Sequence, residues 1–163
     1  MEQDQESKQF DFEVVYADLE KEYDLPKFEL LADDFDIEKI QEKETGYLAR
    51  EIRRAMNEKI TAYIHLFETL INPQSPPMFV FKILKNISTK EKEAIQGFYK
   101  SLSKTQIEIM KLDTVYSEKN EAEFIKQTSQ MWQEMKPKIF KLFESLESNF
   151  ENDDASKGQS YFN

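Results

Sequence analysis

Apolar residues recur three and four positions apart from Ile37 to Ile71, and this spacing restricts the fold more than any other feature of the sequence. It places them along one face of a helix of about nine turns. Gly46 interrupts the pattern and costs a helix roughly 1 kcal/mol relative to alanine, so a kink or break is expected next to Thr45. Pro73 ends the helix. A stripe this long needs other helices to cover it.

Two further long helices are expected, at residues 89–116 and 120–150, where the same three-four spacing returns. Ser88 and Glu91 have the Ser-x-x-Glu form of a capping box and predict where the first of them begins. Pro137 predicts a kink in the second, because proline removes a backbone hydrogen bond. The connection between the two helices is short, and short connections join antiparallel neighbours.

The N-terminal part predicts short helices. Asp11 is a good N-cap, and Phe10 in front of it could pack as a hydrophobic staple on Val15. Pro26 stops this helix, since the residue before a proline avoids the helical region. The expected inward face comprises Val14, Val15, Leu19 and Tyr23.

The predicted fold class is therefore all-α. We expect an elongated up-and-down helical bundle of three long antiparallel helices, plus an N-terminal helix and a short crossover helix. The crossover is expected at 77–86, where a strand would have no partner. The expected divisions of the chain are a disordered tail at 1–9, an acidic arm with short helices at 10–36, the bundle at 37–150, and a disordered tail at 151–163.

Composition argues against most catalytic and cofactor sites. The chain has no cysteine, 1 histidine and 3 glycines, which disfavours thiolate or histidine-rich metal sites and glycine-rich phosphate loops. His65 lies off the apolar stripe and is expected at the surface beside Glu68. The carboxylate pairs Asp33/Asp34 and Glu121/Glu123 are interpreted as solvated. We therefore expect no enzyme, no cofactor and no metal.

The negative charge is concentrated at the N-terminus. Residues 1–45 contain 16 acidic and 5 basic residues, whereas the whole chain has a net charge of −10. Such an acidic arm can fold onto a more basic body, meet a basic partner, or simply be solvated. If the arm contacts the body or a partner, we expect its apolar anchors to be Phe10, Phe28, Leu30, Leu31 and Phe35.

All three arginines lie close together, at Arg50, Arg53 and Arg54, in a chain that otherwise uses lysine. Arginine suits both carboxylates and phosphates. One interpretation is ion pairing with Glu51, with Glu58 or with the acidic arm. The other is an anion, partner or nucleic-acid contact, although the net negative charge disfavours nucleic acid.

These features favour a non-catalytic helical module for protein–protein interaction, an adaptor or regulatory subunit that uses the acidic arm. The alternative is a nucleic-acid- or ribosome-associated factor that contacts phosphates through the arginine cluster and the lysines of the later helices. The many aromatic residues fit either a thick core or an exposed groove for a partner helix. No apolar run is long enough for a membrane span, and a cytoplasmic monomer or homodimer with a protein partner is expected.

Overall fold

The computed structural model describes residues 11–41 and 45–158, with side chains described through residue 151. Within these ranges every regular element is helical and no strand occurs, which confirms the all-α prediction. In chain order the elements are α1 (Phe12–Tyr23), α2 (Phe28–Phe35), the 3₁₀ helix η1 (Ile37–Ile40), α3 (Leu48–Ile71), α4 (Met78–Lys85), α5 (Thr89–Leu112) and α6 (Glu118–Gly158).

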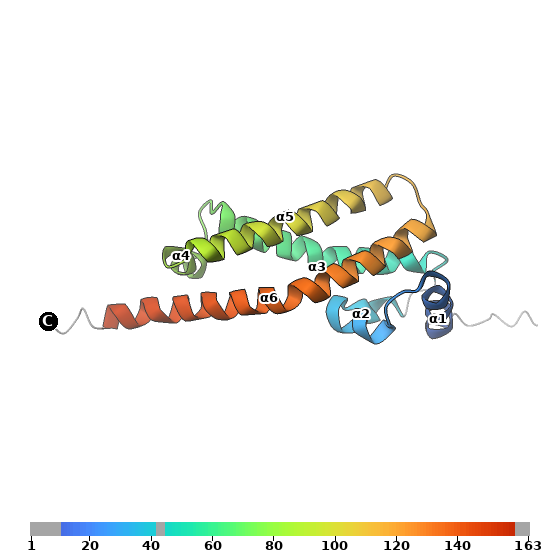
Figure 1. Ribbon diagram of the computed structural model, residues 1–163, viewed down its shortest axis with the longest axis horizontal. Helices are drawn as coiled ribbons and strands as arrows, with labels where there is room; N and C mark the ends of the chain where they lie inside the picture. Colours follow the sequence, from blue (N-terminus) through green and yellow to red (C-terminus); the bar gives the residue numbers. More distant parts are fainter. Residues whose placement is uncertain (1–10, 42–44, 159–163) are drawn as a thin grey trace, which may run out of the picture.

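The body of the molecule is a bundle in which α3 packs against both α5 and α6. Figure 1 shows that α3 and α6 run in one direction along the long axis and α5 runs in the other. Fully buried side chains from all three helices form the core between them. They include Ile52, Met56, Ile60 and Phe67 of α3, Leu102 and Ile109 of α5, and Ile125 of α6.

The helix limits follow local chemistry. The predicted capping box is present at the start of α5, where Ser88 and Glu91 exchange side-chain and backbone hydrogen bonds. The last helix starts at Glu118, ahead of the expected start, and the Ser117 hydroxyl accepts the Asn120 N–H at 3.3 Å. It continues through Pro137 and on to Gly158, into the segment for which composition predicts disorder. Figure 1 shows α6 changing direction along its length, as the internal proline leads one to expect.

The first long apolar stripe is divided between two helices. Its first part forms η1, whose Ile37 and Ile40 are buried, and the rest forms α3 from Leu48 onward. The expected break near Gly46 is therefore a complete interruption. It lets η1 turn back to pack on α3, which one straight helix could not do.

The inward face of α1 matches the expected one in part, because Leu19 is buried and Val15 and Tyr23 pack partly buried against the core. Phe12, Tyr16 and Leu19 are buried, whereas Val14 is 56% exposed. The rings of Phe12 and Tyr16 pack edge-on against Phe28 at 5.1 and 5.5 Å between centroids. Large aromatic side chains gain more from burial than valine does, and they decide which face of α1 turns inward. The staple expected from the preceding phenylalanine lies outside the described residues.

Candidate functional site

The arginine cluster mainly makes contacts within this chain. Arg53 is 1% exposed, and its guanidinium donates to the Glu121 carboxylate at 2.5 Å and to Asp113 at 2.7 Å. Glu121 is itself fully buried. The contact with Glu121 joins α3 to α6, and the contact with Asp113 joins α3 to the connection that follows α5. The interpretation of Glu121 as a solvated carboxylate was wrong, because a buried arginine from a distant helix compensates its charge.

The other two arginines differ in their surroundings. The Arg50 guanidinium lies over the Tyr116 ring at 4.3 Å, and its Nε is 3.6 Å from Glu121, too far for a hydrogen bond. Burial and nearby carboxylates raise the pKa of Tyr116. Arg54 is exposed and pairs with Glu51 at 2.8 Å. The cluster therefore pairs largely with internal carboxylates, and this arrangement favours the ion-pair interpretation over a phosphate contact.

The acidic arm is packed on the bundle. Leu31 and Phe35 are 0% and 2% exposed, Phe28 is partly buried against the core, and Leu30 is 38% exposed. The arm anchor expected at Phe10 lies outside the described residues. Most of the expected apolar anchors thus contact this chain's own core.

Asp34 fastens the arm to the bundle. Its carboxylate is 1% exposed and accepts from the Lys136 ammonium at 2.6 Å and from the Gln133 amide. Lys59 donates to its carbonyl oxygen and lies over the Trp132 ring at 5.2 Å. The interpretation of Asp34 as solvated was therefore wrong as well. Long-range partners on α3 and α6 bury it.

Two contacts hold α1 to α6. The Tyr23 hydroxyl donates to Glu118 at 3.1 Å, and Lys126 donates to Asp24 at 2.6 Å. Desolvation and the Glu22 and Glu118 carboxylates raise the pKa of Tyr23 to about 12. The hydrogen bond from Lys126 holds the pKa of Asp24 below its ordinary value.

The described side chains show no cluster of metal-ligating residues. His65 is exposed, as expected, and its Nδ1 lies 3.8 Å from Glu68. This single contact cannot hold a metal, which needs several ligands.

An open groove runs between α5 and α6. Successive hollows follow it from the start of α5 to the connection between the two helices. Two adjoining hollows, of about 400 and 570 Å³, make up the half near α4. Because α5 and α6 both pack on α3 and contact each other less, the space between them remains open.

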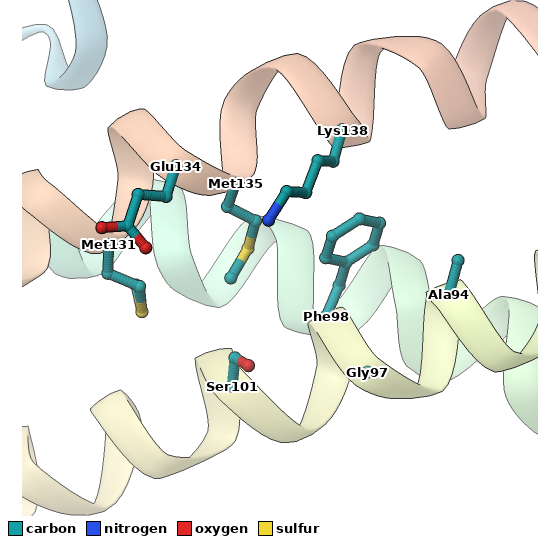
Figure 2. A pocket seen from close by; sticks show the side chains of 8 residues that line it. All are labelled: Ala94, Gly97, Phe98, Ser101, Met131, Glu134, Met135 and Lys138. Atoms are coloured by element: carbon teal, nitrogen blue, oxygen red, sulfur yellow. The ribbon is translucent and has the colours of Figure 1, made fainter.

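Figure 2 shows the middle of this groove. Met131 and Met135 of α6 point their sulfur atoms toward α5, with Phe98 beside them. On the α5 side the lining consists of the large Phe98 and three small residues, Ala94, Gly97 and Ser101. Met135 is buried in the core, whereas Met131 is partly exposed and offers an apolar, polarisable contact to an occupant.

Gly97 has no packing reason to be a glycine. A β-carbon added there would meet nothing within 4 Å, and its backbone does not have a positive φ. Glycine inside a helix costs about 0.8–1.0 kcal/mol relative to alanine. Its remaining advantage is that another group can approach the backbone closely, and here that group would have to lie in the groove.

The half of the groove near α4 is basic. Lys90, Lys138 and Lys141 line it, and within the described part of the chain none of the three forms an ion pair. Glu91 and Glu134 also line it, and the Glu91 carboxylate accepts from Ser145 at 2.5 Å and from Asn149 at 3.0 Å.

The Glu91 carboxylate is already satisfied. Partial burial acts to raise its pKa, but hydrogen bonds from Ser145, Ser88 and Asn149 hold the pKa below its ordinary value. This carboxylate stays ionised and belongs to the joint between α5 and α6. The ammonium groups of Lys90, Lys138 and Lys141 are therefore available to pair with negative charges on another molecule.

Next to this basic half, α4 exposes apolar side chains. Met78, Phe79 and Phe81 are 73%, 55% and 58% exposed, whereas Val80 between them is buried. Asn86, which follows α4, lines the groove. Exposed apolar residues grouped in this way are typical of interaction surfaces.

Sequence reasoning missed the groove residues. Periodicity assigns an inward face to each helix but does not show how far apart two inward faces lie. Gly97 was the available signal, since a glycine in the middle of a strong helix needs a reason. The lysines of the later helices were noted as a group, but the sequence does not show which of them line one groove.

Comparisons with protein-family models, with curated proteins and with solved structures find no match to this chain. No helix in the described ranges is long and apolar enough to cross a membrane.

Proposed function

We propose that this protein is a non-catalytic helical module that binds a partner protein, as an adaptor or regulatory subunit, and that the partner docks in the groove between α5 and α6. The observation that carries the proposal is the groove itself. It combines an apolar wall containing Met131 and Met135 with a glycine on the facing helix and with lysines at one end. Helix-in-groove recognition uses this kind of surface.

The acidic arm has a different role in this proposal from the one expected from the sequence. Its side chains Leu31, Asp34 and Phe35 are buried against α3 and α6. A partner that used these residues would first have to detach the arm. The groove and the α4 surface are accessible without such a change, which favours them as the docking surface.

The test compares three forms of the purified, tagged chain in affinity purification from the native cell: wild type, Gly97→Leu and Gln96→Leu. Leucine at 97 would project into the groove, whereas Gln96 is exposed on α5 and does not line it. A partner of the groove is retained by the wild type and by Gln96→Leu and is lost from Gly97→Leu. Titration calorimetry with that purified partner must then show the same order of affinities. Equal affinity of all three forms for every direct partner would refute groove docking.

A further inference from the structure

We propose that the occupant of the groove is an amphipathic helix of a partner protein whose acidic residues are concentrated in one half of its length. This inference rests on the proposed docking function and adds the chemistry of the partner. It combines the distribution of charge along the groove with the position of Gly97.

The two ends of the groove differ in charge. Near α4 the lining contains Lys90, Lys138 and Lys141 against two carboxylates, Glu91 and Glu134, and the Glu91 carboxylate is held by hydrogen bonds within the protein. Toward the connection between α5 and α6, the lining contains Glu108 and Glu123 together with Lys104 and Lys111, so the charges there balance. Complementary charges on an occupant would therefore be acidic at the first end only.

The dimensions of the groove suit a helix. Its sides are α5 and α6, and α5 has 24 residues, which is about 36 Å at 1.5 Å per residue. Two antiparallel helices that lie side by side with an apolar lining between them can accept a third helix, whose side-chain ridges pack between the ridges of the two walls. At Gly97 the α5 backbone has no side chain, so the occupant can approach most closely there.

The protein already binds acidic helices in this way elsewhere on its surface. Asp34 of α2 is held by Lys136 of α6, and Asp24, which follows α1, is held by Lys126 of α6. Apolar side chains on the inner faces of α1 and α2, among them Leu19, Leu31 and Phe35, are buried against the bundle. The groove near α4 offers the same two elements, apolar side chains and lysine ammonium groups, without an occupant from the described residues.

The test uses a displayed library of 20-residue helices. Leucines are fixed at positions i, i+3, i+4 and i+7 of each repeat, and the other positions are randomised among Glu, Lys, Gln and Ser. Full-length protein is the target, and selected helices are then synthesised and measured by fluorescence anisotropy. Four variants accompany the wild type: Gly97→Leu, Lys138→Glu, and the controls Gln96→Leu and Lys100→Glu. Both control residues are exposed on α5 and lie outside the groove lining.

We expect glutamate to be enriched in one half of the selected helices. Their affinity should fall at least tenfold with Gly97→Leu and about fivefold with Lys138→Glu, while each control stays within twofold of the wild type. Added salt should weaken binding because exposed charges are screened.

Three results would overturn the inference in distinguishable ways. Helices that lose affinity with Gly97→Leu but show no enrichment of glutamate would refute the acidic partner and leave groove docking intact. Absence of enriched helices, or helices indifferent to Gly97→Leu, would refute both proposals. Self-association in sedimentation equilibrium that disappears with Gly97→Leu would identify a second copy of this chain as the occupant and refute a separate partner.

Discussion

Replacement of Gly97 by alanine should stabilise the protein, although most substitutions do the opposite. The added β-carbon meets no atom within 4 Å, so it neither clashes nor gains a packing contact. The remaining effect is helix propensity, which favours alanine by about 0.8–1.0 kcal/mol inside a helix. For a chain of this size we expect the melting temperature to rise by about 2–4 °C.

The measurement is urea unfolding followed by circular dichroism. With a slope of about 1–3 kcal/mol per molar urea, the midpoint should rise by about 0.3–1 M while the slope stays constant. The matched control is Gln96→Gly on the same helix, which should lower stability by a similar amount and so reports the cost of glycine in α5. If Gly97→Ala lowers the midpoint while Gln96→Gly behaves as expected, the space beside Gly97 is not open and the argument for the groove fails.

Two further outcomes follow from buried or bridging contacts. Arg53→Ala should lower the free energy of unfolding by about 3–5 kcal/mol, because it leaves the Glu121 carboxylate buried without its cation. Arg54→Ala should change the free energy of unfolding by less than about 0.5 kcal/mol. If chemical denaturation shows similar losses of stability for both variants, the internal role of the cluster is contradicted. Ser145→Ala should cost about 1 kcal/mol at neutral pH by removing a hydrogen bond to the ionised Glu91. The folded state lowers the pKa of Glu91. Its contribution is therefore present above the ordinary pKa and is lost as the pH falls through the lower folded value. The difference in stability between the two proteins should shrink as the pH falls below the ordinary glutamate pKa of about 4.3; a constant difference across the pH range would show that Ser145 acts through another contact.

Much of the fold could be predicted from the sequence because the deciding signals are local. The three-four spacing of apolar residues predicts the three long helices, and Ser88 with Glu91 predicts the capping box at the start of α5. Asp11 as an N-cap is likewise confirmed, since its carboxylate accepts the N–H groups of Glu13 and Val14. Each of these depends on residues within one or two turns of one another.

The candidate site could not be predicted in the same way. Arg53 was recognised as unusual, but its partner Glu121 lies 68 positions away. Asp34 looked like any other acidic residue until α6 brought Lys136 beside it. Whether a charged residue is solvated or buried depends on which distant residues pack over it. The residues next to it in the sequence do not indicate this.

The amino-acid sequence by itself determined that this chain is helical, where α1 and α5 begin, and that its negative charge is concentrated at the N-terminus, because propensity, capping and composition act over short distances. Tertiary packing decided the rest. It turned the aromatic face of α1 inward, buried Arg53 with Glu121, and spaced α5 and α6 so that a groove stays open between them. The physical reason is that two helices with similar apolar stripes can lie in contact or apart, and the choice depends on how both fit against α3.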